Sequence, residues 1–398
     1  MTRIRKLKRV LRVPLWVVAA LAIVKSAWFA WAAPAADGND IEADRADIAA
    51  RRDYLLARVA TGSFGVLDMP SFVNSPYRQE LAIATLSATS VAMTNVAFRD
   101  PAQRERSRDA VRIMLDRLLS DEIRRYDVLW WGEDALDTLD GPNGHVGYLG
   151  HLNLTLGCYF LLGGDDPEMG ALFERVSATL ARRLEASNSL HAESFPGWIY
   201  TADNVVVIAS LRMHDLAFGD RYADLVSRWL AVTRAKLLDP DSGMMRYHVS
   251  KAGEAAGTAR GVLQAWDSLW LPLIDEEFAR DQYARLNDRL VARSAVGNFV
   301  AIREYPAGES GPTDLVSGPL IFGLSPTATG FAMGGAAFRG ERGQLAGLLR
   351  TAELAGFTVS WGGRRSYLFA PLPGDAIILA ARTMTRWDAR FVSRALPR

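Results

Sequence analysis

The chain has 398 residues, of which 49% are hydrophobic and 23% are charged, a balance typical of a globular protein with a sizeable core. Its formal net charge is +1, but residues 1–36 carry seven basic side chains and no acidic one, so residues 37–398 hold 39 Lys and Arg against 45 Asp and Glu. A mildly acidic body argues against the clustered basic surface that nucleic acid requires, and we expect no nucleic-acid partner.

The N-terminal segment has the pattern of an export signal. Six basic residues within the first twelve precede an apolar stretch at 13–24, and small and aromatic residues extend that stretch to Ala36. The span is also long enough, at about twenty residues, to remain as a membrane anchor. We therefore predict a signal peptide or signal anchor at 1–36, with the body on the periplasmic side of the cell envelope, either held at the inner membrane or secreted.

From residue 43 onward, apolar residues recur at helical spacing in segment after segment. The predicted helices span 43–60, 77–97, 102–120, 146–163, 167–187, 201–218, 220–237, 258–271, 276–293, 325–338, 341–356 and 373–386. Twelve helices separated by polar connections predict hairpins stacked around a ring. We therefore expect 37–398 to form one all-α domain, an (α/α)6 barrel, with short β-hairpins in loops at 243–250 and 299–303.

Two segments concentrate the acid–base candidates. His151 precedes an apolar helical run, and an imidazole there could act as a general acid or base or simply be a hydrogen-bonded helix residue. Asp203 begins another helix after an aromatic loop, 195–200, that contains a Pro-Gly bend. Its carboxylate could take part in chemistry, or it could only cap the helix.

Tryptophans and acids cluster at 129–134 and again at 266–270. Sugar rings stack on indole faces and hydrogen-bond to carboxylates, so these clusters motivate a glycan-processing alternative. Tryptophans packed between helices explain the same pattern. A third segment, 308–330, is rich in Gly, Pro and small hydroxyl residues, and we interpret it as a loop at the rim of a pocket, with Asp314 as a participant, or as a tight turn between helices.

The five histidines are scattered, the chain has a single cysteine, Cys158, and it contains no His-x-x-x-His, Cys-x-x-Cys or acidic-loop pattern. We therefore expect no metal site, and a lone cysteine allows no internal disulfide.

Several short motifs occur in an order that resembles the linalool dehydratase/isomerase family. They are Gly150-His151-Leu152-Asn153-Leu154, Asp203-Asn204, the turn at 239–243 with Tyr247-His248 after it, and Arg303-Glu304 followed by Asp314 and Gly318. The resemblance covers about residues 65–340. It implies an exported (α/α)6 barrel whose pocket, at the barrel mouth, protonates a hydroxyl group and removes a proton to form an alkene, without cofactor or metal.

The resemblance also carries some site residues over to this chain. It implies that His151, Tyr77 and Tyr247 take the family's catalytic positions. The family's aspartate has no clean counterpart, because Ser71 stands near its place and Asp68 lies one helical turn earlier. Two pocket cysteines of the family are absent, and Tyr200 and Asp203 occupy the matching region.

The resulting hypothesis is an enzyme, a hydro-lyase or isomerase that uses cofactor-independent acid–base chemistry on a small apolar alcohol or alkene. His151 and Asp203 would exchange protons with the substrate, and tyrosines would orient its hydroxyl group. The candidate catalytic residues are His151, Asp203, Tyr77, Tyr200 and Tyr247. The candidate substrate-binding residues are Trp130, Trp131, Asp134, Asn153, Trp198, Asn204 and Asp314.

Two other functions remain open. One is a glycosidase or polysaccharide lyase with an acid–base pair drawn from Glu133, Asp134, Asp267 or Asp314. The other is a non-catalytic binding or scaffold protein of the cell envelope. The chain could touch the membrane through an uncleaved N-terminal helix, and barrels of this kind can form homo-oligomers, which the residues do not decide.

Overall fold

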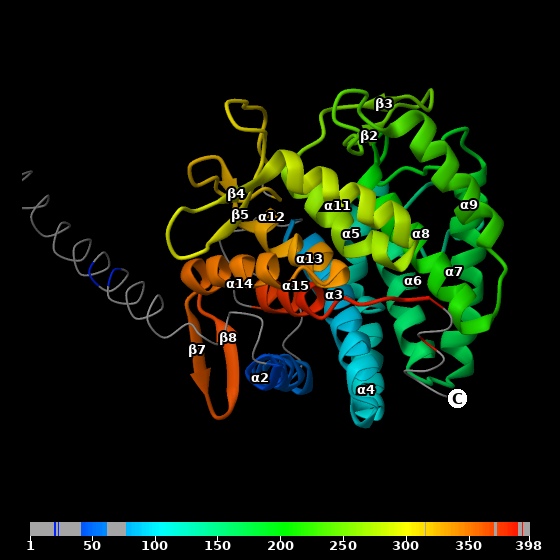
Figure 1. Ribbon diagram of the computed structural model, residues 1–398. Coiled ribbons are helices and arrows are strands. Elements are labelled where there is room, and N and C mark those ends of the chain that lie inside the picture. The colour runs from blue at the N-terminus through cyan, green and yellow to red at the C-terminus, as the bar shows by residue number, and fades with distance from the viewer. Residues whose placement is uncertain are drawn as a thin grey trace, which may run out of the picture.

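The computed structural model describes residues 41–61, 77–314, 316–369 and 372–388, together with the single residues 20, 23 and 392. The predicted signal segment at 1–36 therefore lies outside the described residues except for Ala20 and Ile23, and Asp68 and Ser71 lie outside them too. Most of the described chain is helical (Figure 1).

Six helices form a closed inner ring. They are α3 (Tyr77–Arg99), α6 (Val146–Leu161), α8 (Thr201–Phe218), α10 (Gly261–Trp270), α12 (Pro326–Phe331) and α15 (Pro373–Arg382). Each of them packs on the next in chain order, and α15 packs on α3 to close the ring. In Figure 1 the colour passes round the molecule from cyan through green and yellow to orange, until red α15 lies beside α3.

Six further helices pack outside this ring. They are α2 (Ile41–Ala60), α4 (Arg104–Leu118), α7 (Pro167–Glu185), α9 (Ala223–Val232), α11 (Glu276–Leu290) and α14 (Arg342–Gly356). Each outer helix packs on one or two inner ones, for example α7 on α6 and α8, and α2 on α15. The predicted (α/α)6 barrel is therefore confirmed.

The inner helices are apolar on nearly all sides because the ring surrounds them. Helix α3 is the clearest case: it is long and apolar enough to cross a membrane, yet 89% of its most apolar window is buried inside the protein. Burial of this kind is what the core helix of a barrel requires.

Three helix starts follow local sequence signals. Asp166 accepts the backbone N–H groups of Glu168 and Met169, with Pro167 in the first turn, and Asp275 and Ser325 cap α11 and α12 in the same way. The predicted helix at 325–338 is divided into α12 and α13 (Met333–Arg339). Helix α5 (Asp121–Trp131) was not predicted. Short helical turns occur at Pro101–Gln103, Thr233–Leu237 and Leu271–Leu273.

The strands are short and lie in the connections. Strands β1 (Ile199–Tyr200), β2 (His248–Val249) and β3 (Ala255–Ala256) form one antiparallel sheet, with Tyr200 opposite His248. Strands β4 (Val291–Arg293), β5 (Val300–Arg303) and β6 (Leu324–Ser325) form a second, and β7 (Thr358–Trp361) and β8 (Arg364–Tyr367) form a hairpin. The predicted strands correspond to β2 and β5, whereas the β7–β8 hairpin was not predicted.

The alternation of inner and outer helices explains where a site can form. Since each inner helix is followed by an outer helix that returns, all six inner helices run in the same direction and begin at one end of the barrel, which we call the mouth. The connections that lead into inner helices are the long ones, including 119–145, 186–200, 238–260 and 291–325. The mouth therefore carries the N-terminal ends of the inner helices and most of the irregular chain.

Candidate functional site

At the mouth, one carboxylate lies within electrostatic reach of another. Glu80 is in the first turn of α3 and Asp203 is in the first turn of α8, and both residues are partly buried. Burial raises the pKa of Glu80 to about 7, the negative charges of Asp203 and Asp314 add to this effect, and a hydrogen bond from Tyr126 opposes it. Burial also raises the pKa of Asp203 to about 6, against a hydrogen bond from Ser194.

Three tyrosines surround this carboxylate pair. Tyr126, from α5, is buried and hydrogen-bonds Glu80, and its ring meets the edge of Phe195 with centroids 6.1 Å apart. Tyr200 and Tyr247 lie with ring centroids 5.0 Å apart and are hydrogen-bonded to each other. Burial raises the pKa of Tyr200, and the charges of the carboxylate pair raise it further, so all three hydroxyl groups stay protonated at neutral pH.

Arg260 connects a mouth loop to the inner ring. It is the N-cap residue of α10, and its guanidinium forms ion pairs with Glu304, at 3.1 Å, and Asp314, at 2.8 Å. The same guanidinium lies over the ring of Tyr247, 5.0 Å from its centroid. These contacts hold Asp314, on the loop after β5, within electrostatic reach of Glu80. Burial raises the pKa of Glu304 to about 7 against the charge of Arg260.

His151 lies deeper in the ring than the carboxylate pair. Its Nδ1 is 2.7 Å from the hydroxyl oxygen of Ser87, which is two helical turns, or roughly 10 Å, beyond Glu80 on α3. The rings of Trp266 and Trp270 meet it edge-on, with centroids 6.0 and 6.1 Å away. Burial lowers the pKa of His151 to about 4, so the imidazole is neutral at pH 7.

Another deep group accompanies the two tryptophans. Asp267 lies between them in the sequence of α10 and is buried, and its Oδ1 has no hydrogen-bond partner among the described residues. Burial raises its pKa to about 8, so the carboxyl group holds a proton at neutral pH. It is a second group at this depth that is uncharged at pH 7.

Aromatic residues from the mouth loops form the rim. Trp198 is 51% exposed and lies parallel to Tyr200, with centroids 6.0 Å apart. The ring centroids of Trp130 and Phe195 are 4.9 Å apart, and those of Trp131 and the buried imidazole of His145 are 4.5 Å apart. Of the three tryptophans predicted to bind substrate, Trp198 thus belongs to the aromatic loop 195–200 and Trp130 packs against it.

The other predicted residues have different surroundings. Tyr77 is the first residue of α3 and is 45% exposed. Asn153 bonds Ser177 and Ser210, and joins α6 to the helices on either side of it. Asn204 bonds both backbone groups of Ala192 and the carbonyl of Tyr200.

Two of the predicted acids, Asp134 and Asp203, have side-chain partners of their own. Asp134 pairs with Arg124 at 2.6 Å and accepts the backbone N–H of Leu136. Asp203 does not cap α8, because Tyr200 is the N-cap residue and the carboxylate of Asp203 bonds Ser194 instead. The charge of the Asp203 carboxylate also raises the pKa of Glu80.

The structure thus brings Asp203, Tyr200 and Tyr247 together, as three of the five predicted catalytic residues, and adds Glu80 and Tyr126. Neither addition was predicted from the sequence. Acids are common in the first turn of a helix because they interact favourably with the helix dipole. Glu80 was therefore not recognised as a functional candidate from the sequence. One signal was present, since no charged residue follows Glu80 until Arg99.

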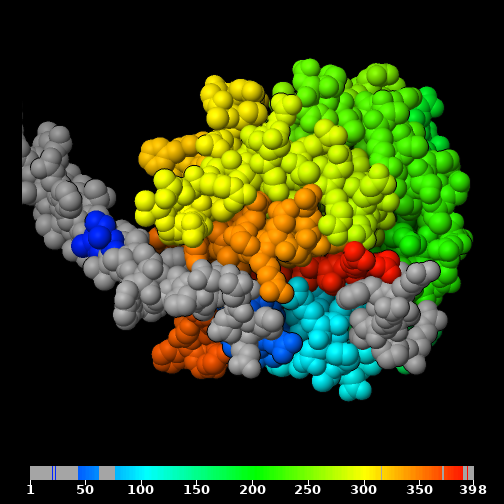
Figure 2. All heavy atoms as spheres, in the orientation of Figure 1, coloured from blue at the N-terminus to red at the C-terminus, as the bar shows by residue number. Residues whose placement is uncertain are grey.

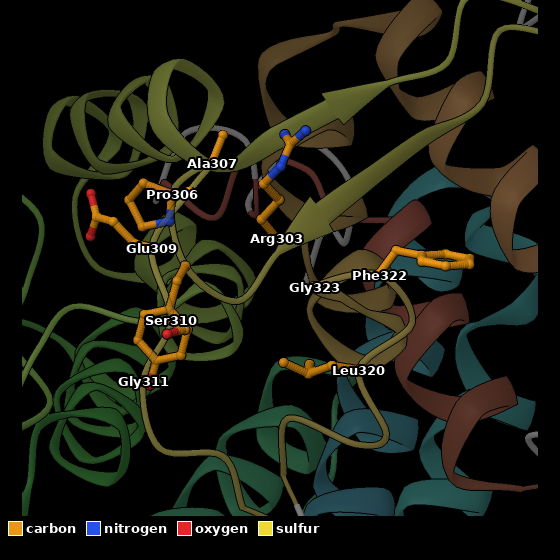
Figure 3. A pocket seen from close by; sticks show the side chains of 11 residues that line it. Arg303, Pro306, Ala307, Glu309, Ser310, Gly311, Leu320, Phe322 and Gly323 are labelled. Atoms are coloured by element: carbon orange, nitrogen blue, oxygen red, sulfur yellow. The ribbon is translucent and has the colours of Figure 1, made fainter.

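A groove of about 180 Å³ lies elsewhere on the rim (Figure 3). Its walls come from β5, the loop that follows it and the turn before β6, with Glu309 and Phe322 on opposite sides in Figure 3. Neither member of the carboxylate pair lines this groove. Within the described part of the chain, no group of three or more His, Cys, Asp or Glu residues is arranged to hold a metal ion.

Comparison with known proteins supports the family resemblance. The family model for linalool dehydratase/isomerase matches residues 170–353, which include Asp203, Tyr200 and Tyr247 but not Glu80 or His151. A similar solved structure is a glycoside hydrolase from family 105 of C. acetobutylicum ATCC 824, with 10% identity and a TM-score of 0.48 over 74% of this chain and 92% of that one. Over residues 170–353, somewhat less than half of its length, the chain is therefore similar to the linalool dehydratase/isomerase family.

Proposed function

We propose that this protein is a cofactor-independent lyase or isomerase that acts by acid–base chemistry on a small, largely apolar alcohol or alkene. One observation carries the proposal: Glu80 and Asp203, from the starts of two inner helices, form a carboxylate pair in which the charge of Asp203 raises the pKa of Glu80, beside three protonated tyrosines. The match to the linalool dehydratase/isomerase family supports the same class of reaction.

Dehydration of an alcohol needs one group that gives a proton and one that takes a proton. Protonated Glu80 gives its proton to the hydroxyl oxygen, and the C–O bond breaks as its electron pair leaves with water. The Asp203 carboxylate takes a proton from the neighbouring carbon, and the electrons of that C–H bond form the double bond. Proton transfer back to another carbon of the alkene gives isomerisation, and the pair regains its starting state by exchanging protons with solvent.

Different pKa values fit these two roles. Two neighbouring carboxyl groups titrate as a pair, and the singly protonated form is the one that holds both a donor and an acceptor. With values of about 7 and about 6, this form is most abundant near pH 6.5. Tyr200 and Tyr247 keep their protons and would donate hydrogen bonds to the substrate hydroxyl.

This proposal changes the role predicted for His151. A buried imidazole with a pKa of about 4 carries no transferable extra proton at pH 7, and it already contacts Ser87. We assign His151, with Trp266 and Trp270, to the apolar inner end of the site, where it orients the substrate. Tyr77, exposed at the start of α3, has no assigned step.

The test is a product analysis in D2O with the purified protein, using terpene alcohols, the corresponding alkenes and oligosaccharides as substrates. We expect an alkene or an isomer from one of the alcohols, with deuterium incorporated into the isomer from solvent. Glu80→Gln and Asp203→Asn should each abolish both. Asp116→Asn, which changes an exposed carboxylate on outer helix α4, is the matched control.

Turnover of an alcohol that survives both Glu80→Gln and Asp203→Asn would exclude the pair as the reacting groups. A second function also has a specific observation in its favour: Trp198 is half exposed at the rim and parallel to Tyr200, as a sugar-stacking platform would be. Cleavage of an oligosaccharide that is lost in both variants would support glycan processing instead. No turnover of any substrate would favour the non-catalytic envelope protein.

We further propose that the segment at 1–36 exports the protein and that, where it is retained, it tethers the barrel to the membrane on the periplasmic side. The support is the sequence pattern of basic residues followed by an apolar stretch. Fractionation of cells that produce the full chain tests this: we expect the protein in the envelope fraction, and recovery in the cytosol would contradict it.

A further inference from the structure

The β7–β8 hairpin has a tight turn that fixes which side chains point to each side. Its two turn residues, Gly362 and Gly363, both have positive φ angles of 55° and 76°, as a two-residue hairpin turn of the primed type requires. Trp361 stands opposite Arg364, and Val359 stands opposite Ser366. Because side chains alternate along a strand, these four residues share one face.

The other face of the hairpin is bound to the barrel. Arg51 of α2 donates a hydrogen bond of 2.9 Å to Thr358 and lies 4.0 Å from the ring centroid of Tyr367. Arg365 pairs with Asp47 of α2 at 2.6 Å. The hairpin therefore has a fixed orientation on α2 and presents its opposite face outward.

The outward face is apolar and exposed. Trp361 is 89% exposed and Val359 is 44% exposed, and Leu368, which the same alternation places on this side after Ser366, is 55% exposed. In Figure 2 the dark orange atoms of this segment project from the body at the lower left. Large apolar side chains gathered on one projecting element are typical of an interaction surface.

The position of the hairpin turn indicates what covers the outward face. Arg365 contacts Asp47, and Tyr367 contacts Arg51, so β8 and α2 run in the same direction. The turn before β8 therefore lies toward the start of α2. The apolar stretch that ends at Ala36 leads into α2 at Ile41, and five residues can span at most about 18 Å.

We propose that the outward face of the hairpin, Val359 and Trp361 with Leu368, inserts into the interfacial region of a lipid bilayer. Trp361 lies at the level of the headgroups, the position that indole rings prefer, and Arg364 contacts lipid phosphate. The inference rests on retention of the 1–36 segment as an anchor and is independent of the chemistry at the mouth.

The experiment uses the full chain reconstituted into vesicles of phosphatidylethanolamine and phosphatidylglycerol. A Trp361→Cys variant is labelled with an environment-sensitive fluorophore, and lipids that carry a quencher near the headgroup report contact with the bilayer. Burial raises the pKa of the native Cys158 thiol to about 12, so this thiol stays unlabelled. Phe322→Cys, at a fully exposed aromatic position before β6, is the matched control, and Val359→Cys gives a second position on the hairpin.

We expect the quencher lipids to reduce the fluorescence at positions 361 and 359 several-fold more than at position 322. Equal, weak quenching at all three positions in vesicle-bound protein would overturn the proposal. So would labels at 361 and 359 that become shielded as protein concentration rises without lipid, because another copy of the chain would then cover the face. Failure of the full chain to remain on the vesicles would overturn it as well.

Discussion

Two acids in this barrel, Asp47 at the closure of the ring and Glu80 at the mouth, have pKa values shifted in opposite directions. At the closure of the ring, burial would raise the pKa of Asp47, but Arg382, Arg51 and Arg365 outweigh it and hold the pKa at about 2. At the mouth, burial raises the pKa of Glu80 to about 7, and the charges that act on it, from Asp203 and Asp314, are negative. Burial acts in the same direction in both groups, so the neighbouring charges decide the outcome.

The difference separates a structural role from the proposed chemical one. The arginine-rich group joins α2 to α15, since Arg382 pairs with Asp44 and Asp47, and Arg51 pairs with Asp375. Its acids differ: three arginines hold the pKa of Asp47 at about 2, whereas burial raises the pKa of Asp375 to about 7 against the charge of Arg51. At Glu80, by contrast, no arginine among the described residues opposes burial, and the neighbouring charges raise the pKa further.

Replacing one mouth acid should separate activity from stability. We expect Glu80→Gln to reduce kcat by about 10²- to 10⁴-fold, because it removes the proton donor, while the free energy of unfolding at pH 7.5 does not fall. Steady-state kinetics on the identified substrate and urea unfolding measure the two quantities. A variant that lost activity in parallel with stability would show that Glu80 has a structural role like that of Asp47.

The reverse result is expected at the closure of the ring. Arg51 is fully buried and pairs with Asp47, Glu353 and Asp375, so Arg51→Met takes a buried cation away from three carboxylates. We expect the free energy of unfolding to fall by about 3–5 kcal/mol, with kcat unchanged at temperatures where the variant is folded.

The control for that variant is Arg106→Met. The pair between Arg106 and Asp53 is solvent-exposed, so its loss should cost less than about 1 kcal/mol. Equal losses in the two variants would mean that the buried network does not stabilise the ring closure more than a surface ion pair does.

A pH titration of stability sharpens the comparison. The folded protein holds the Glu80 proton up to a pKa of about 7, whereas the unfolded chain releases it near the ordinary value of 4.5. Between these values the unfolded state binds fewer protons, so Glu80 lowers stability as pH rises from about 4.5 to 7. The expected size is on the order of 2 kcal/mol, less than the full shift implies because Glu80 is partly exposed.

Urea unfolding between pH 4.5 and 8 measures this loss. Glu80→Gln should remove it, and should therefore be more stable than the parent protein at pH 7.5 and equally stable at pH 4.5. Asp47 contributes in the opposite sense, since its folded pKa of about 2 lies below the ordinary 3.8, and its stabilisation is lost only as pH falls toward 2. Identical pH dependence in Glu80→Gln and the parent would contradict the raised pKa.

The fold was far more predictable than the site. Apolar residues at helical spacing located all twelve ring helices, because the burial of a helix in the ring leaves its mark on the local sequence. Helix α5 escaped detection because its only fully buried positions are Ile123, Tyr126 and Asp127. The site depended on distant partners: Glu80 and Asp203 are more than 120 positions apart, and nothing in the local sequence of either indicates the other.

His151 shows the same limit from the other side. Its residue type and the family resemblance both pointed to proton transfer, but its protonation depends on burial between α3 and α10, which only the closed ring determines. The predicted amides Asn153 and Asn204 likewise have hydrogen-bond partners from other elements. The sequence indicated polar residues near the mouth but did not show which of them have a structural role.

The smallest expected effect concerns Asp314, which combines properties of the structural acids and of the mouth acids. It pairs with Arg260, like a structural acid, yet its charge also raises the pKa of Glu80. In Asp314→Asn that negative charge is gone and the Arg260 charge is less neutralised, so the pKa of Glu80 should fall. The alkaline limb of the activity profile should move to lower pH by less than about one unit, because Asp314 is partly exposed and solvent screens its charge.

Glu309→Gln is the control, since Glu309 is an exposed acid on the same loop that lines the rim groove instead of pairing with Arg260. Its profile should match the parent. If Asp314→Asn left the alkaline limb in place but raised KM, the ion pair with Arg260 would only position the loop. A shift of the alkaline limb at constant KM would show that the Asp314 charge raises the pKa of Glu80. Glu80 would then stay protonated at neutral pH because of this loop charge as well as because of burial.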